Sequence, residues 1–137
     1  MWWTYALLSA LFAALTAIFA KIGIKDVDTD LATAIRTVVI LIIAWGIAFF
    51  RGGVGTIDTL TRENIVFLIF SGIATGLSWI FYFKALQLGK VSQVAPVDKL
   101  SVAIAIILSI LFLGEKITLK LFIGSIMIIG GTFVLIL

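Results

Sequence analysis

Residues Gly89–Thr118 read GKVSQVAPVDKLSVAIAIILSILFLGEKIT, and this stretch decides how the chain is interpreted. It holds the only proline of the chain, Pro96, followed at once by the oppositely charged neighbours Asp98 and Lys99. No charge then occurs from Leu100 to Leu113. Ionisable groups at the start of such an apolar helix are costly in a bilayer and are typical of sites that bind or move a solute. The pattern predicts a membrane span with a working site near this proline.

The composition excludes several classes of protein. Of the 137 residues, 63% are hydrophobic and 12% are charged, and the mean hydropathy is +1.30. A soluble domain is about 45–50% apolar and about 25% charged, so this chain has too few charges for a soluble surface. It contains no cysteine and no histidine, which excludes disulfides, histidine–cysteine zinc sites and a Ser-His-Asp triad. We expect no cofactor, no metal and no enzymatic activity.

Five apolar blocks have the length of about 20 residues that a membrane-spanning helix needs. They cover roughly residues 3–22, 31–50, 65–86, 92–113 and 119–137. The first block lacks the basic start of a signal peptide. Thr61 is a plausible cap for the third helix, and Gly114 suits the position after a helix end. The prediction is an all-α integral membrane protein with one domain, residues 1–137, of five transmembrane helices.

The charges near the span ends are balanced between the two sides of the membrane. The net charge of +3 is scattered between apolar blocks rather than clustered, so we expect no nucleic acid as a partner. With five spans, the side of the N-terminus carries Arg51, Arg62, Lys116 and Lys120, and the other side carries Lys21, Lys25, Lys84 and Lys90. Orientation follows a bias in lysine and arginine, and four against four gives none. Either the chain inserts both ways and pairs with its inverted copy, or a partner sets one orientation.

Polar and small side chains recur at helical spacing, because positions separated by 3, 4 and 7 share one face. The residues of these stripes are Ser71, Thr75, Ser78 and Tyr82 in the third block, with Gly72 and Gly76 of a GxxxG motif beside them, and Tyr5 and Ser9 in the first block. One interpretation is a polar cavity for a solute. The other is helix packing, in which hydroxyl groups bond back to the preceding turn and glycines let a second backbone approach.

Four further residues are candidates for binding. Arg36 lies about five residues inside the second block and either reaches the headgroups or pairs with Asp98 or an anionic substrate. Asp98 could pair with Arg36, pair with Lys99 of a second copy, titrate, or form an interfacial salt bridge. Adjacent helical side chains point about 100° apart, so Lys99 of the same chain is not automatically its partner. Trp79 and Tyr82 could stack on an organic substrate such as a cation, or pack in the core.

Several motifs occur in a characteristic order. Trp79–Gly89 reads WIFYFKALQLG; Val94-Ala-Pro96 follows; and Leu113-Gly-Glu115 precedes a last helix with three glycines. Lys21 ends the first block and Arg36 lies early in the second. In these features the whole chain resembles the EamA domain of the drug/metabolite transporter superfamily. Most relatives carry two such domains that face each other as inverted repeats. The resemblance therefore implies that this chain is one repeat unit and forms a homodimer, an antiparallel one.

The resemblance also implies transport of small metabolites or drugs by alternating access, in a prokaryotic cell membrane. The short multidrug transporters of the superfamily carry a glutamate in the first helix, and this chain has none in residues 3–20. Only Asp98 could take its place in proton coupling, and facilitated transport without coupling is equally open. Two alternatives remain: a flippase, or flippase subunit, for a lipid-linked substrate, and a membrane scaffold without transport.

Overall fold

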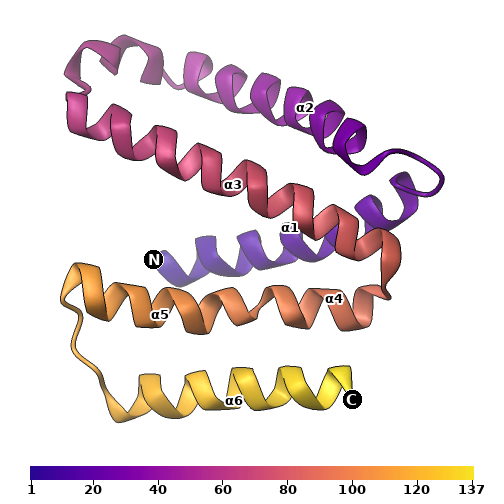
Figure 1. The fold of residues 1–137 in the computed structure, drawn as a ribbon. Helices are drawn as coiled ribbons and strands as arrows, with labels where there is room; N and C mark the ends of the chain where they lie inside the picture. Colours follow the sequence, from indigo (N-terminus) through magenta and orange to yellow (C-terminus); the bar gives the residue numbers. More distant parts are fainter. The chain divides into compact units, whose positions relative to one another are not determined.

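The computed structural model describes residues 1–137 and confirms the predicted all-α fold. Its helices are α1 (Trp2–Gly23), α2 (Thr29–Phe50), α3 (Arg62–Leu88), α4 (Val91–Asp98), α5 (Leu100–Leu113) and α6 (Leu119–Ile136), with a 3-10 helix, η1 (Gly53–Thr59), between α2 and α3 (Figure 1). Five stretches are long and apolar enough to cross a membrane, with α4 and α5 together forming the fourth. The predicted number and order of spans are confirmed.

Polar side chains fix where several helices begin. The side chain of Thr61 accepts a hydrogen bond from the backbone N–H of Asn64 at 3.2 Å, which confirms the predicted cap of α3. Thr118 caps α6 in the same way through the N–H of Leu121, also at 3.2 Å. Asp28 caps α2 by accepting from the N–H groups of Asp30 and Leu31. Because the Thr61 cap recruits Arg62–Asn64 into the first turn, α3 begins three residues before the predicted start at residue 65.

The fourth span is divided, where the sequence predicts one continuous helix over residues 92–113. The division falls at Lys99, between α4 and α5. The Lys99 N–H lies 3.3 Å from the carbonyl oxygen of Ala95 and 3.0 Å from that of Pro96, so the turn is tightened toward 3-10 geometry. Pro96 has no N–H to donate and disturbs the preceding turn. The two segments nevertheless continue in nearly the same direction (Figure 1).

The chain forms two compact units. Unit 1 comprises Met1–Ile18 and Leu88–Leu137, and unit 2 comprises Phe19–Gln87. In unit 1, α6 packs against both α4 and α5. In unit 2, η1 packs against the end of α2, and α2 and α3 run side by side (Figure 1). Each unit supplies its own group of polar contacts, described below.

Very few side chains are buried within the chain. The buried hydrophobic residues are Ala17, Ile24, Phe83, Leu86 and Ala103, whereas large apolar side chains are exposed along every span. In water such a surface would favour aggregation, because soluble proteins rarely expose large contiguous apolar patches. The backbone of each span is satisfied inside its own helix, as hydrocarbon surroundings require. The surface therefore fits contact with lipid or with another protein chain.

Gly114 ends α5 in the left-handed region, with φ 68°, as its predicted place after a helix end requires. Replacing it with alanine is expected to lower the stability of the protein by about 1–2 kcal/mol, because a Cβ is strained in this conformation. Gly55→Ala is the matched control, since Gly55 also has open space around it but lacks a positive φ. Thermal unfolding in detergent measures both variants, and equal midpoints would contradict the assigned role of Gly114.

Candidate functional site

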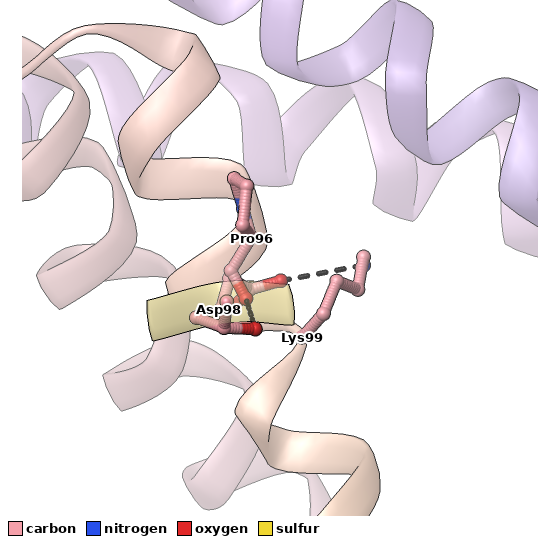
Figure 2. Close-up of polar contacts among 4 residues, drawn as sticks. Pro96, Asp98 and Lys99 are labelled. Atoms are coloured by element: carbon pink, nitrogen blue, oxygen red, sulfur yellow. Dashed lines mark hydrogen bonds and ion pairs between the residues drawn. The ribbon is translucent and has the colours of Figure 1, made fainter. Parts of the chain in front are cut away.

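Asp98 and Lys99, the acid and base of the organising stretch, form an ion pair with each other. The Nζ of Lys99 lies 3.4 Å from the Oδ2 of Asp98 (Figure 2). The Asp98 side chain is 34% exposed and that of Lys99 57% exposed. Helical geometry alone did not predict this pair. It forms because Lys99 sits in the tightened turn between α4 and α5 and has a long, flexible side chain.

The carbonyl group of Pro96 joins this turn to the last helix. The Oγ1 of Thr132 on α6 lies 3.3 Å from the Pro96 carbonyl oxygen and 2.8 Å from that of Ile128 in its own helix. Thr132 is buried, with 4% of its surface exposed. Hydroxyl groups that bond across helices strengthen packing in membranes. Pro96, which marks the predicted working site, is therefore held by α6 directly beside the ion pair.

Arg36 and Trp79 form the second group of contacts, in unit 2. The Cζ of Arg36 lies 4.3 Å from the ring centroid of Trp79 and 5.1 Å from that of Phe83. These distances are typical of cation–π contacts, in which the guanidinium group lies against an aromatic face. The predicted aromatic face of Trp79 is thus already in contact with a cation from the protein itself. Tyr82, on the same helix, is partly buried.

A polar cluster joins the end of α3 to the connection between α1 and α2. The Nε2 of Gln87 donates to the carbonyl oxygens of Val27 at 2.9 Å and Ile24 at 3.3 Å. The Nζ of Lys21 donates to the carbonyl oxygen of Leu86 at 2.5 Å. A hollow of about 720 Å³ opens here, lined by Lys21, Ile22, Ile24, Lys25, Asp26 and Gln87. Its charged side chains are two lysines and one aspartate, which leaves the hollow net positive.

The predicted polar stripes lie on the surface of the chain. Ser71, Thr75 and Ser78 are exposed on α3, as are Tyr5 and Ser9 on α1. The hydroxyl group of Thr75 bonds back to the carbonyl oxygen of Ser71 at 2.8 Å, as the packing interpretation allows.

The two glycines of the GxxxG motif are open as well. A Cβ added at Gly72 or Gly76 would meet no atom within 4 Å. Within unit 2, no neighbouring helix therefore uses this motif for close packing. Its predicted role in packing remains a prediction for contact with a second chain.

Comparison with known families decides the classification. The profile of the EamA-like transporter family matches residues 1–137. The chain belongs to this family. The resemblance drawn from the motifs around Trp79–Gly89 and Pro96 is thereby confirmed, and the protein is a multi-span member of a family of membrane transporters. No solved structure matches the chain.

Two curated relatives have similar sequences. One, named "Uncharacterized transporter in cobO 3'region", comes from a Sinorhizobium species and is 46% identical over 134 residues, which cover 98% of this chain and 95% of the relative. The other is an uncharacterized protein of Methanocaldococcus jannaschii, 35% identical over 74 residues, or 54% of each chain. The Sinorhizobium protein is therefore a chain of about the same size.

Two residues with clear roles in this EamA-like chain were not predicted as site residues. Thr132 is a polar residue in the apolar second half of the last block, directly after Gly130 and Gly131, and that contrast was the available signal. Gln87 lies four and eight residues after Phe83 and Trp79, so it shares their helix face. This polar residue at the end of an aromatic helix face was the signal that could have predicted polar contacts at the end of α3.

Proposed function

We propose that this EamA-like chain transports small organic solutes by alternating access across a prokaryotic cell membrane, as an antiparallel homodimer with dual topology. The observation that carries the proposal is the uncovered stripe of α3. Its exposed hydroxyl groups and open glycines form a surface where a second helix could approach closely and leave polar groups beside a path. In membrane proteins, polar groups on spans usually face the interior of a bundle or a water-filled cavity.

The charge distribution supports the antiparallel arrangement. With the helix bounds of the structure, Arg51 and Arg62 flank η1, while Lys21 and Lys84 lie near the helix ends at the opposite side of α2 and α3. The balance of four basic residues against four is unchanged. A chain without bias can insert in both orientations. Two inverted copies would reproduce the inverted-repeat plan, in which the substrate binds near the midplane.

In this proposal, Asp98 and Lys99 bind the charged group of the solute or a coupling ion. Their ion pair is partly exposed and lies where the fourth span is divided. The N–H of Lys99 stays hydrogen-bonded to the preceding turn, so a ligand here would meet the charged side chains of the pair rather than unwound backbone. Ionisable side chains within a span usually belong to substrate or ion pathways. The hydrogen bond of Thr132 to Pro96 holds the segment before the pair in place.

Dual topology is tested with a single cysteine in a chain that has none. Thr56→Cys places the thiol on η1, where Thr56 is exposed. A membrane-impermeant thiol reagent is applied to sealed cells and again after permeabilisation. We expect about half of the molecules to be labelled from outside, because the charge balance favours neither orientation.

A second cysteine provides the matched control. Ser92→Cys lies at the start of α4, on the opposite side of the membrane from η1, is exposed, and leaves the net charge unchanged. Dual topology predicts half labelling at both positions. Complete labelling at one position and none at the other would mean a single orientation. That result would contradict the antiparallel homodimer and favour a subunit that works with a different partner chain, such as a flippase subunit.

A further inference from the structure

We infer that Arg36 of unit 2 binds the oxyanion of a small organic solute, a carboxylate or a phosphate, with Trp79 and Phe83 supporting the guanidinium group. This inference rests on the proposed transport function and adds the class of substrate. The contact of the Arg36 Cζ with the two rings, at 4.3 Å and 5.1 Å, is its starting point.

Arg36 carries a permanent charge that this chain does not neutralise. The side chain of arginine stays protonated in proteins. The ion pair of the structure is the one between Asp98 and Lys99, and Arg36 takes no part in it. The acidic residues of unit 2 all lie in connections, in η1 or in the first turn of an α-helix: Asp26, Asp28, Asp30, Asp58 and Glu63. A cation among apolar spans with no carboxylate beside it is an attractive site for an anion.

The depth of Arg36 argues against a side chain that merely reaches the headgroups. Arg36 lies seven residues after the start of α2 and Trp79 nine residues before the end of α3. At 1.5 Å per residue, both positions are about 10–14 Å from the helix ends, so both lie within helices that are long and apolar enough to cross a membrane. The guanidinium group turns toward a ring at similar depth. It is therefore held inside the span rather than drawn to the membrane surface.

The two aromatic contacts leave the N–H donors of the guanidinium group without a conventional acceptor. Neither the indole of Trp79 nor the phenyl ring of Phe83 offers an oxygen or nitrogen acceptor, so both rings contact the cation without satisfying its donors. These donors match a carboxylate or phosphate with two parallel hydrogen bonds. For the same reason the site disfavours a cationic solute, because the nearest aromatic face is already occupied by Arg36. A cation or proton that accompanies the anion would use Asp98 instead.

The face of α3 that carries the two rings leads to the positively charged hollow. Trp79, Phe83 and Gln87 are spaced four residues apart and share one face of the helix. Gln87 lines the hollow together with Lys21 and Lys25. The hollow, at about 720 Å³, is within the size range of small-molecule sites, about 300–1,000 Å³. An anion attracted by the two lysines would therefore lie one to two helical turns from Arg36.

Fluorescence of Trp79 provides the test. Trp2, Trp3 and Trp45 are replaced by phenylalanine in the full chain, so that Trp79 is the only tryptophan. The purified protein, in nanodiscs of phosphatidylcholine, is titrated with benzoate, phenyl phosphate and benzylammonium. We expect a saturable change in Trp79 emission with at least one of the two anions and none with benzylammonium. In the same background Arg36→Gln should weaken anion binding by about 10- to 100-fold, the effect of losing a charged hydrogen-bond partner.

Two further variants separate binding from folding. Arg36→Lys keeps the charge but lacks the planar pair of donors, so its affinity should fall between the wild type and Arg36→Gln. Lys84→Gln removes an exposed cation of α3 and should bind the anions as the wild type does. Equal anion affinities for the wild type and Arg36→Gln, or a response only to benzylammonium, would overturn the inference.

The same titration in nanodiscs that contain phosphatidylglycerol distinguishes a free solute from a lipid headgroup. If phosphatidylglycerol alone shifts Trp79 emission and neither benzoate nor phenyl phosphate binds, Arg36 holds a lipid phosphate and the inference is wrong. Measuring solute uptake into proteoliposomes distinguishes a failure of this inference from a failure of the proposed transport function. Uptake of benzylammonium without anion binding would overturn only the substrate class, whereas anion binding without uptake of any solute would overturn only transport.

Discussion

Replacing Asp98 with asparagine is expected to abolish transport by this EamA-like protein while its helices remain folded. Asparagine keeps the shape of the side chain but removes the charge that pairs with Lys99 at 3.4 Å. The change also leaves Lys99 without its partner, in a span where an unpaired charge is unfavourable. Solute uptake into proteoliposomes measures the effect, and circular dichroism checks that the helical content is unchanged.

The double variant Asp98→Asn/Lys99→Gln decides whether the pair is only structural. If Asp98 merely neutralises Lys99, removing both charges together should restore transport, because no group is then left unpaired. If Asp98 itself binds a coupling ion or the solute, the double variant stays inactive, and this is the result we expect. Asp58→Asn, in η1, is the control for loss of an acidic residue elsewhere. Wild-type uptake by Asp98→Asn would refute the assignment of the site.

Replacing Gly76 with leucine is expected to abolish dimer formation without unfolding the chain. Because a Cβ at this position meets no atom within 4 Å, the substitution starts from open space within unit 2. The GxxxG face allows a second helix to approach only while both glycines lack side chains. Crosslinking in membranes, followed by size-exclusion chromatography in mild detergent, should show the shift from dimer to monomer, and uptake should be lost with it.

The control for this variant is Gly46→Leu in α2. Gly46 also has open space around it, but no glycine lies four residues away in either direction. It should remain dimeric, and Gly72→Leu should behave like Gly76→Leu. A fully dimeric and active Gly76→Leu protein would show that the stripe of α3 is not the interface, and the homodimer would then need a different surface.

The spans could be predicted from sequence because their signal is physical and local. An apolar block of about 20 residues has few alternatives to a transmembrane helix. Thr61 marks the start of one helix and Gly114 the end of another, and both signals depend only on local backbone geometry. The family could be predicted because the motifs from Trp79 to Glu115 keep their order and spacing. The division at Lys99 was harder, since Pro96 is tolerated within many membrane helices and need not interrupt the one that contains it.

Partners of side chains could be predicted less well. The sequence left three possibilities for Arg36: the lipid headgroups, Asp98 or an anionic substrate. Its contact with Trp79 and Phe83 depends on how α2 and α3 lie relative to each other, which no local pattern specifies. The pairing of Asp98 with Lys99 depends on one tightened turn. The sequence also could not show that Gly72 and Gly76 have open space around them. A GxxxG motif has the same sequence whether its partner helix belongs to the same chain or to another chain.

The hydrogen bonds of Gln87 and Lys21 fix one end of α3 in unit 2, so a rotation of this helix would displace mainly its other end. They fasten the end of α3 to the last turn of α1 and to the connection that precedes α2, whereas η1 at the far end packs on α2 and has no buried residue. A rigid rod that pivots at one end moves most at the other. The arm from Gln87 back to Arg62 is about 38 Å long, so a rotation of about 5° would displace the η1 end of α3 by about 3 Å. Arg36 and Trp79 lie close to the pivot and would stay in contact through such a swing.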